Sequence, residues 1–467
     1  MKKMLSLLLA LVCLCLPLMA AAEEPITIDN IRSLVVGVDD PVEVKPGLTR
    51  PIINFDNAAT TPALRPVVDE VNAKLLTYGS IGRGFSAKSN ISTEIYEKTR
   101  DKVLHFTGAN PDKYTVFYVN NTTDGLNKLA SALITSKEDT VLCTRMEHHA
   151  NDLSWRERCN VIYAEIARDG RIDYDEIEKK LKENKVKLVA VTAASNVTGY
   201  VTDVHRVAKL AHRYGAQIVV DGAQIVAHRA FSMKGATPEE DIDFFVFSAH
   251  KMYSPFGGGA VVGLTEELDK HMPAFYGGGM IRIVADSWVT WASAPKLYEA
   301  GSPNYPGVVG LGKAIEILEQ VGFDAISAHE QALIRRLMDS LKKMDNVVIY
   351  GDSENISDRV GVVTFNFNDA NSLLVAQRIA NQGGATRRGA FCAHPYVWRL
   401  MNIPDDQLEW YVECTDGKTP GMIRVSFGIY NTEAEVDEFL GMVAEAVRSV
   451  RAKEDWDDLY EDFSESY

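Results

Sequence analysis

Short apolar segments alternate with helical patterns along the middle of the chain, from about residue 112 to residue 264. The apolar segments are rich in β-branched and aromatic residues and have the length of buried strands, whereas the stretches between them repeat with a helical period. Strands separated by helices form βαβ units, so this order predicts an α/β protein with a large, mostly parallel sheet. The expected strands are 114–119, 141–143, 161–166, 188–192, 216–220, 243–247 and 260–264, and the expected helices are 123–135, 151–158 and 204–214.

The pattern changes after residue 305, where two long helical stretches are followed by strands and helices in irregular order. The expected helices are 308–320, 323–343, 372–381 and 432–451, and the expected strands are 347–349, 360–367 and 423–427. This predicts a smaller α+β C-terminal domain. The expected organisation is a signal peptide at 1–22, an N-terminal arm at 23–50, a large domain at 51–305, a small domain at 306–452 that also takes up the arm, and a solvated acidic tail at 453–467.

The N-terminus has the layout of a secretory signal peptide. Lys2 and Lys3 precede an apolar run, and Ala20 and Ala22 supply the small residues of a cleavage site before Glu23. An uncleaved anchor is the alternative, because the run is nearly long enough to span a bilayer, but the acidic and polar residues that follow favour cleavage. We therefore expect an exported protein, periplasmic or extracellular, with no membrane segment after cleavage.

Four cysteines remain after such cleavage, namely Cys143, Cys159, Cys392 and Cys414. An exported protein meets an oxidising compartment, so these thiols either pair or stay free for chemistry. The sequence alone does not decide the pairing.

Composition and charge exclude several classes of protein. The chain has 467 residues, of which 46% are hydrophobic and 24% are charged, as is typical of a globular protein. Its formal net charge of −15 argues against a nucleic-acid partner, because phosphates need a positive field. The run GVVGLGKA at 307–314 resembles a phosphate-binding loop but lacks the final Ser or Thr, so we interpret it as a tightly packed helix start. No spacing of Cys and His supports a metal site.

Polar and reactive side chains follow four of the expected strands, at 121–125, 147–151, 221–224 and 248–251. The carboxyl ends of parallel strands share one edge of a sheet, which is where α/β proteins bind ligands. Lys251 follows a strongly apolar strand, and desolvation there would favour the neutral amine that forms a Schiff base. Asp221 ends the run QIVVD, where a carboxylate can pair with a protonated pyridine nitrogen.

Each of these signals also has an ordinary structural explanation. Lys251 alone could be a surface loop residue, and Asp221 could cap a turn. Thr122 and Thr123 open a helix, where N–H groups and hydroxyls suit a phosphate, but an ordinary helix cap uses the same residue types. His148 could stack on an aromatic cofactor ring, although a single histidine is more often structural.

The signals become specific in combination. FDNAATTP at 55–62, EHHAN at 147–151, SNVTG at 195–199, VDGAQ at 220–224, FSAHKMYSPFGGG at 247–259 and EAGSPN at 299–304 occur in this order. In residue type and order they resemble the class V aminotransferase family of fold-type I enzymes, which use pyridoxal 5'-phosphate (PLP). The resemblance runs from about residue 54 to residue 448, and it is strongest to the cysteine desulfurase and selenocysteine lyase branch.

The resemblance implies a role for each matching residue. Lys251 would be the Schiff-base lysine, and His148 would stack on the cofactor ring and help to move protons. Asp221 would hold the pyridine nitrogen and Gln224 the phenolic oxygen, while Asn196 would contact substrate or cofactor. The residues implied for the phosphate are Thr122, Thr123, Ser248 and His250, with Ser302 of the partner subunit in a homodimer.

Two further motifs concern the substrate. Arg424, in MIRVSFG, matches the arginine that binds the substrate carboxylate, as a planar guanidinium does with two hydrogen bonds, and Arg387 would assist it. Cys392, in RRGAFCAHP, matches the cysteine that takes sulfur as a persulfide, which requires a thiolate near positive groups such as Arg387 and Arg388. The alternative is a small buried or disulfide-bonded cysteine. The Ala-Phe pair before Cys392 differs from the His-His pair often seen in the closest sulfur-mobilising enzymes.

The sequence thus predicts a homodimeric PLP enzyme that removes sulfur or selenium from a small amino acid to give alanine. A Cys392 persulfide would carry the sulfur, and a sulfur-acceptor protein is a possible partner. The alternatives are an exported aminotransferase or an amino-acid or peptide epimerase on the same scaffold, and a non-catalytic binding protein that kept the fold. Intact Lys251, Asp221, His148 and Arg424 argue against a binding protein, which needs no Schiff-base lysine.

Overall fold

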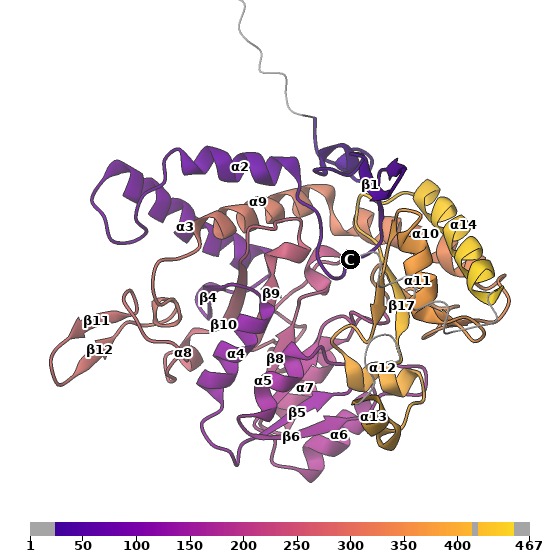
Figure 1. Ribbon diagram of the computed structural model, residues 1–467. Helices are drawn as coiled ribbons and strands as arrows, with labels where there is room; N and C mark the ends of the chain where they lie inside the picture. The colour runs from indigo at the N-terminus through magenta and orange to yellow at the C-terminus, as the bar shows by residue number, and fades with distance from the viewer. Residues whose placement is uncertain (1–23, 413–418, 453–467) are drawn as a thin grey trace, which may run out of the picture.

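The computed structural model describes residues 24–412 and 419–452. The expected signal peptide at 1–22, Cys414 and the expected acidic tail at 453–467 lie outside the described residues. Among those described, no helix combines the length and the apolar character that crossing a membrane requires. The chain is organised around two sheets, which are connected by the long helix α9 (Tyr305–Val321) and by the segment before residue 62 (Figure 1).

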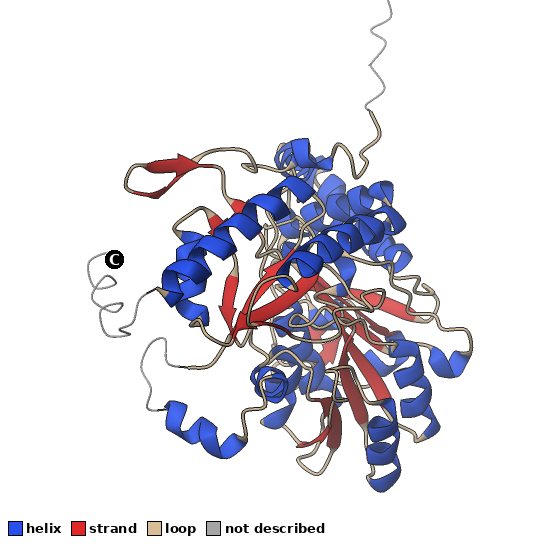
Figure 2. Ribbon diagram, turned by 90° about the vertical axis from the view of Figure 1, so that its right-hand side faces the viewer, coloured by secondary structure: helices blue, strands red, loops and turns tan. Residues whose placement is uncertain are grey.

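A seven-stranded sheet forms the centre of the larger unit, in the order β4-β10-β9-β8-β7-β5-β6. Its strands are β4 (Tyr114–Val119), β5 (Thr140–Thr144), β6 (Asn160–Ala164), β7 (Leu188–Thr192), β8 (Gln217–Asp221), β9 (Phe244–Ser248) and β10 (Gly259–Leu264). All run in one direction except β10, which is antiparallel to both neighbours. Every residue of β7 and β9 is buried, because helices cover both faces of the sheet (Figure 2). The predicted α/β class with a mostly parallel sheet is confirmed.

The direction of β10 follows from the short link that precedes it. The chain from Ser248 to Gly259 contains only the 3₁₀ turn η4 (Ala249–Lys251), and a parallel neighbour would need a longer crossover. β10 therefore begins at the edge where the parallel strands end, and Gly259 pairs there with Ser248 of β9 and Val119 of β4. This edge carries the polar segments that the sequence analysis singled out.

Helices cover the large sheet on both sides. Besides α9 they are α2 (Arg65–Leu75), α3 (Ala87–Phe106), α4 (Thr122–Leu133), α5 (Ala150–Arg156), α6 (Tyr174–Glu183), α7 (Val204–Arg213) and α8 (Thr265–Leu268), with the 3₁₀ helices η1 (Ile31–Leu34), η2 (Ile225–Ala227), η3 (Pro238–Glu240) and η5 (Lys296–Tyr298). α9 lies against α2 and α3 (Figure 1). The glycine run 307–314 lies in the first turns of α9, and a Cβ atom at Gly310 would collide with the Ser254 hydroxyl. The run is thus a tightly packed helix start, as expected.

A four-stranded antiparallel sheet organises the C-terminal part of the chain, in the order β13-β14-β17-β16. Its elements are β13 (Val347–Ile349), β14 (Val362–Phe367), β16 (Arg387–Gly389) and β17 (Met422–Ser426), with helices α10 (Phe323–Leu341), α11 (Ser372–Ala380), α12 (His394–Leu400), α13 (Asp405–Val412) and α14 (Glu433–Arg451). α10 and α11 both pack on α14, and together with the sheet they enclose an apolar core of their own.

The N-terminal segment is part of this smaller core before it crosses to the large sheet. After the hairpin of β1 (Val42–Lys45) and β2 (Leu48–Arg50), strand β3 (Ile53–Asn54) pairs in parallel with β15 (Gly384–Ala385). The Phe55 ring then packs edge-on against Phe427 and Phe439, at centroid distances of 5.0 and 5.1 Å. The motif FDNAATTP therefore starts in one unit and ends in the other.

Several elements were not expected from the apolar pattern. They are α2, α3, α6, α8, α12, α13, β1, β2, β3, β15, β16 and the hairpin of β11 (Ile281–Val284) and β12 (Val289–Trp291). Helix α3 illustrates the cause, because its buried positions include Ser89, Ser92 and Thr99. A helix that buries small polar residues has too weak an apolar stripe for its period to be recognised.

Candidate active site

One cavity of about 430 Å³ at the carboxyl edge of the large sheet gathers most of the predicted site residues. They come from the segments that follow β4, β5, β7, β8 and β9. The predicted residues that line the cavity are Thr122, Thr123, His148, Asn196, Asp221, Gln224, Ser248, His250 and Lys251. The parallel strands end together here, so side chains that lie far apart in the sequence share one pocket.

Lys251 is half-buried and lies at the end of η4. Burial lowers the pKa of its amine to about 8; the Asp221 carboxylate opposes this shift, and the Arg424 guanidinium adds to it. Among the described residues, its amine has no hydrogen-bond or ion-pair partner. A far larger fraction of this amine than of an ordinary lysine is therefore in the neutral, nucleophilic form at ordinary pH.

Asp221 is buried at the end of β8, 3% exposed. One of its oxygens, Oδ1, accepts a hydrogen bond from the Ala223 N–H at 2.9 Å, and the other has no partner among the described residues. Burial raises the pKa of the carboxyl, while this hydrogen bond and the Lys251 amine lower it. A buried carboxylate with one oxygen uncommitted is suited to a positively charged ring nitrogen.

His148 is held as a neutral imidazole. Its Nδ1 accepts a hydrogen bond from the Ala150 N–H at 3.0 Å, so the ring proton lies on Nε2. Burial lowers the pKa of His148 to about 3, and the nearby positive charges of Lys251 and Arg424 contribute. A neutral ring can lie against an aromatic ligand without adding a charge to the cavity.

Glu147 is a buried carboxyl behind His148 that the sequence analysis did not single out. Its two oxygens accept hydrogen bonds from the Thr144 hydroxyl and the Asn151 side-chain amide, both at 2.6 Å. Burial raises the pKa of Glu147 to about 8, against the effect of these two hydrogen bonds. The only signal in the sequence was its place in EHHAN, directly after a buried strand.

The start of α4 forms the end of the cavity that suits an anion. The Ser248 hydroxyl oxygen accepts a hydrogen bond from the Thr122 N–H at 2.7 Å and lies 2.7 Å from the Thr122 hydroxyl. Thr123 is exposed at the same helix start, and burial lowers the pKa of His250 to about 4. Two hydroxyls and the N–H groups of a helix start form a site of the kind that binds phosphate.

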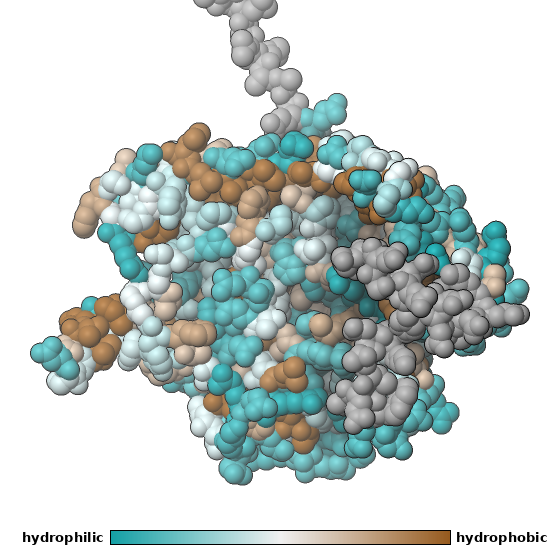
Figure 3. Space-filling model, viewed as in Figure 1, coloured by the Kyte–Doolittle hydropathy of each residue, from teal (hydrophilic) through white to brown (hydrophobic). Residues whose placement is uncertain are grey.

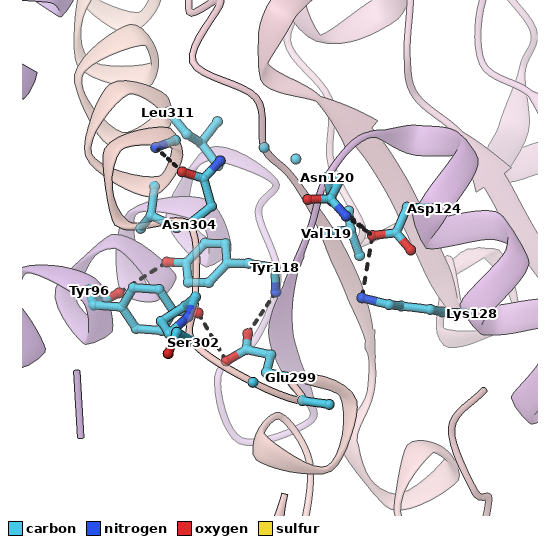
Figure 4. A pocket seen from close by; sticks show the side chains of 17 residues that line it. Tyr96, Tyr118, Val119, Asn120, Asp124, Lys128, Glu299, Ser302, Asn304 and Leu311 are labelled. Carbon is cyan, nitrogen blue, oxygen red and sulfur yellow. Dashed lines mark hydrogen bonds and ion pairs between the residues drawn. The ribbon is translucent and has the colours of Figure 1, made fainter. Parts of the chain in front are cut away.

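Ser302 lies outside this cavity. It is exposed and lines a neighbouring cavity of about 210 Å³ together with Tyr96, Tyr118 and Glu299 (Figure 4). Glu299 accepts a hydrogen bond from the Tyr118 N–H at 2.7 Å. Asn120 lines both cavities, so the two are adjacent. Within one chain Ser302 therefore does not lie with the other residues expected to hold the phosphate, and its contribution from a partner subunit stays a prediction.

Arg424 and Arg387 converge on one carboxylate, that of Asp56. The Arg424 Nη2 lies 2.9 Å from Asp56 Oδ1, and the Arg387 Nη2 lies 2.8 Å from Asp56 Oδ2. Arg424 is buried, 3% exposed, and its Nη1 also donates to the Asn196 carbonyl at 3.1 Å. Its Nε is buried without a partner among the described residues. Asp56 was missed although it lies in FDNAATTP, because nothing in that motif indicates which charges face it.

Cys392 is exposed and unpaired, on a loop that is held in a strained conformation. Phe391 and Cys392 both have φ of +53°, a left-handed conformation that costs energy for residues other than glycine. Two hydrogen bonds hold them there, from the Asn196 side chain to the Phe391 carbonyl at 2.7 Å and from the His149 N–H to the Cys392 carbonyl at 2.6 Å. Strain of this kind is concentrated at functional sites.

The thiol is next to the Lys251 cavity. Cys392 lines a space of about 290 Å³ with Thr123, His148 and His149, and the first two of these also line the larger cavity. The other described cysteines, Cys143 and Cys159, are buried and free. The alternative of a buried or disulfide-bonded Cys392 therefore does not describe this structure.

Two residues shortly before Cys392 have partners of their own. The guanidinium of Arg388, one of the two arginines expected to favour the thiolate, donates to the Thr419 carbonyl at 2.6 Å and to the Ser372 hydroxyl at 3.2 Å. Phe391 is buried, and the Arg424 guanidinium lies 4.9 Å from the centre of its ring. The phenyl group at this position thus covers one face of the arginine.

Residues 56–61 contact both the small sheet and the residues that line the Lys251 cavity. The Asp56 backbone bridges to Ser426 of the small sheet. The Ala58 carbonyl accepts a hydrogen bond from the Gln224 side chain at 2.9 Å, and the Thr61 hydroxyl donates to the His250 carbonyl at 3.1 Å. The segment thereby fixes the arginines of the smaller unit relative to the cavity of the larger one.

Residues 53–439 match the family model described as Aminotransferase class-V. A probable cysteine desulfurase of Halalkalibacterium halodurans is 33% identical over 396 residues, which cover 83% of this chain and 91% of the relative. A cysteine desulfurase of Haloferax volcanii is 34% identical over 404 residues, which cover 85% of this chain and 89% of that protein. The matched span contains every residue of the cavity.

The solved structures that this chain resembles include cysteine desulfurases as well. The apo structure of a cysteine desulfurase from Thermococcus onnurineus has a TM-score of 0.76 at 31% identity, and the match covers 85% of this chain and 95% of that chain. The S-sulfonic acid form of the cysteine desulfurase CsdA from Escherichia coli has a TM-score of 0.75 at 26% identity, with 91% of this chain and 99% of that chain covered.

Proposed function

The chain belongs to the aminotransferase class-V family, and on that premise we propose that it is a cysteine desulfurase that works with PLP. In the reaction the Cβ–S bond of L-cysteine breaks and an S–S bond to the Cys392 Sγ forms. The products are alanine and a Cys392 persulfide, so atoms and electrons balance without a further reactant. The selenium analogue of cysteine would react in the same way.

The donor set of the cavity fits PLP. The Lys251 amine, with its pKa lowered to about 8, suits the aldehyde of the cofactor. The uncommitted oxygen of buried Asp221 suits its pyridine nitrogen, and Thr122 and Ser248 at the start of α4 suit its phosphate. When bound, PLP acts as an electron sink for bonds that break at the substrate Cα.

The residues of this chain supply binding, orientation and proton transfer. Arg424 and Arg387 bind the α-carboxylate of the amino acid and so fix which Cα bond faces the cofactor. The Lys251 Nζ takes the proton from Cα, for which a pKa of about 8 is well placed. The Cys392 Sγ attacks the substrate sulfur from the loop that Asn196 and His149 hold.

The exposed thiol of Cys392 beside the cavity is the observation that carries the assignment to desulfuration. A transaminase or an epimerase needs the lysine and the carboxylate-binding arginines, but neither needs a free thiol on a strained loop at the entrance. Cys392 lies near enough to act electrostatically on both Lys251 and Arg424, whose pKa values it raises against the lowering effect of burial.

A direct test compares the purified protein with Cys392→Ala and, as a matched control, Cys159→Ala, which removes a buried thiol away from the cavity. With L-cysteine, the wild type and Cys159→Ala should release sulfide under reducing conditions and form alanine. Cys392→Ala should keep the cofactor absorption band and lose desulfuration. Unchanged sulfide release by Cys392→Ala would overturn the role of the thiol, and a pyridoxamine spectrum with other amino acids would indicate transamination instead.

The working form of the enzyme is a homodimer in this proposal. Support comes from exposed apolar side chains on the loop after α2 and on the β11–β12 hairpin, which Figure 3 shows as brown areas on the same side of the molecule. They include Leu76, Phe85, Val284 and Trp288, which are 77%, 104%, 62% and 53% exposed. A second copy would cover them and bring its own Ser302 to the phosphate.

The proposal also includes export of the protein from the cytoplasm. Residues 1–22 would direct the protein out of the cytoplasm, and a thiol-bearing acceptor protein in that compartment would receive the persulfide sulfur. Mass spectrometry of the mature protein, together with cell fractionation, tests the first part. An intact N-terminus on cytoplasmic protein would overturn it.

A further inference from the structure

A largely buried carboxylate, that of Glu299, anchors the segment that leads to Ser302. Glu299 accepts hydrogen bonds from both terminal nitrogens of the Arg100 guanidinium, at 2.8 and 2.7 Å. The Tyr118 N–H and the Tyr96 hydroxyl donate to the same carboxylate at 2.7 and 3.1 Å (Figure 4). These donors come from helix α3 and strand β4, so the carboxylate is held by the large unit.

The guanidinium of Arg100 is itself held in place. Arg100 is 7% exposed, and its guanidinium carbon lies 5.0 Å from the centre of the Tyr96 ring and 4.6 Å from that of Tyr118. Its Nη1 also donates to the Val116 carbonyl at 2.6 Å. Because both aromatic rings and the strand are parts of the core, the position of Glu299 is determined by that core.

Residues 300–303 form a short, mostly exposed segment that is fixed at both ends. Glu299 holds its start. The Asn304 side chain holds its end, because it accepts a hydrogen bond from the Gly307 N–H at 3.1 Å as the cap of α9. Ser302 is exposed within this segment, and its hydroxyl has no hydrogen-bond partner among the described residues. Such a hydroxyl is suited to a group that lies outside this chain.

Stability alone does not explain a buried ion pair at this place. Taking two charges out of water costs about as much as their attraction returns, so apolar side chains of similar size would often stabilise a fold equally well. A bidentate pair of guanidinium and carboxylate adds a defined geometry, because two parallel hydrogen bonds orient both groups. The pair of Arg100 and Glu299 thus fixes the direction in which the chain continues towards Ser302.

We propose that Arg100 and Glu299 are positioning residues for the cofactor site of the partner subunit. They hold residues 300–303 so that Ser302 reaches the phosphate of the PLP that the partner binds. The described residues that line the Lys251 cavity of the same chain include neither of them, so the effect belongs to the other subunit's site. The inference rests on the proposed PLP-binding homodimer, but it does not depend on what happens to sulfur.

The first measurement is the dissociation constant of PLP, determined by equilibrium dialysis of the cofactor-free dimer. Arg100→Met with Glu299→Gln should weaken PLP binding about tenfold, the factor expected when one hydroxyl no longer reaches the phosphate. In a Ser302→Ala background the same pair of substitutions should weaken binding no further, because all three groups act through one hydrogen bond. Lys102→Met with Glu316→Gln removes another ion pair of α3 and is the matched control, which should bind PLP as the wild type does.

Urea unfolding separates a positioning role from a merely structural one. Glu299→Gln alone leaves the buried Arg100 without its counter-charge and should lower the midpoint of unfolding. In the paired variant the midpoint should recover, whereas the affinity for PLP should stay low. Recovery of both together would overturn the proposal. Tyr96→Phe removes one hydrogen bond to Glu299 and leaves the ion pair in place, so a severalfold loss of PLP affinity is expected there even if the paired variant does not fold.

Mixed dimers show in which subunit the pair acts. In the first, one chain carries Lys251→Ala and the other carries Arg100→Met with Glu299→Gln. The remaining Lys251 then receives an intact Ser302 segment, so PLP should become trappable there by borohydride with wild-type affinity. In the second, one chain carries all three substitutions beside a wild-type chain, and the remaining lysine should bind PLP about tenfold more weakly. Equal affinities, or the reverse order, would overturn the proposal.

Failure of the proposed function has a different signature. A wild type that traps PLP on Lys251 but releases no sulfide from L-cysteine would refute desulfuration and leave the positioning role intact. Unchanged PLP affinity of the paired variant, in a dimer that still releases sulfide, would refute only the role of Arg100 and Glu299.

Discussion

The backbone N–H of His149 donates a hydrogen bond to the carbonyl oxygen of Cys392 at 2.6 Å, across the boundary between the two sheets. His149 follows strand β5 of the large sheet, whereas Cys392 follows β16 of the small one. A second bond, from the Asn196 side chain to the Phe391 carbonyl at 2.7 Å, spans the same boundary. The position of the thiol is therefore set by the large unit, although its chain segment belongs to the small one.

Removing the Asn196 anchor should loosen the loop that carries Cys392. Asn196→Ala leaves the Phe391 carbonyl without its donor, at a cost of about 1–3 kcal/mol. The two left-handed residues should then relax, and the rate at which iodoacetamide alkylates Cys392 in the cofactor-free protein should change severalfold. Peptide mapping identifies the labelled thiol, and Asn160→Ala on the exposed edge strand β6 is the control. An unchanged rate in Asn196→Ala would contradict the anchoring role.

The pKa of Lys251 should be visible in cofactor attachment. The neutral amine is the reactive form, so the rate at which PLP becomes trappable by borohydride in the cofactor-free protein should rise with pH and level off above about 8. Arg424→Gln removes a positive charge that lowers this pKa and should move the midpoint up, whereas Asp221→Asn should move it down. A midpoint near the usual lysine value of about 10.4 in all three proteins would refute the effect of burial.

Much of the large sheet was predictable because its strands carry their own signal. β4 and β7 were predicted with the bounds that the structure shows, since both are short apolar runs between polar turns. The direction of β10 was not predictable from its residues, because it depends on the length of the preceding link. The hairpin β11–β12 was missed because most of its positions are exposed and only Ile281 and Trp291, at its base, are partly buried, so it has no regular alternation of buried and exposed positions.

The residues that line the cavity were predictable for a related reason. The pairing of Asp56 with Arg387 and Arg424 was not. Residues that end parallel strands must meet at one edge, and this places Lys251, Asp221 and His148 together without knowledge of any distance. The meeting of Asp56 with Arg424 depends on how residues 53–57 join the small sheet. No local pattern encodes that contact, because it joins residues near opposite ends of the chain.

Substitutions at Asp56 and Arg387 should have non-additive effects on the free energy of unfolding, because the Asp56 carboxylate pairs with both Arg387 and Arg424. Asp56→Asn leaves two opposed guanidinium groups, one of them buried, and should lower the free energy of unfolding by about 2–4 kcal/mol. Adding Arg387→Gln should recover part of that loss, because the repulsion disappears. Urea unfolding of the two single variants and the double variant measures the coupling. Simple additivity of the two substitutions would show that the three groups do not act as a unit.

The glycines of α9 should be required for packing. Gly310→Ala places a Cβ atom against the Ser254 hydroxyl and should lower the free energy of unfolding by about 1–3 kcal/mol. Gly441 in α14 has open space around its Cβ position, so Gly441→Ala should stabilise the protein by about 0.5–1 kcal/mol. Opposite signs of the two changes in thermal unfolding would support the packing argument, and equal signs would refute it.

The exposed side chains of the β11–β12 hairpin should decide the oligomeric state. Val284 and Trp288 are 62% and 53% exposed, an apolar surface that water penalises unless a second copy covers it. The double variant Val284→Asp with Trp288→Asp should therefore sediment as a monomer where the wild type sediments as a dimer. Val42→Asp, which charges a 48% exposed position on β1, is the matched control and should stay dimeric.

The same double variant tests the predicted position of Ser302. If the partner subunit's Ser302 helps to hold the phosphate, the monomeric variant should bind PLP more weakly, by about tenfold for the loss of one good hydrogen bond to a charged group. Equilibrium dialysis with PLP measures the difference, and Ser302→Ala in the dimeric protein should reproduce it. A monomer that binds PLP as tightly as the wild type would show that each chain holds the phosphate with its own residues alone.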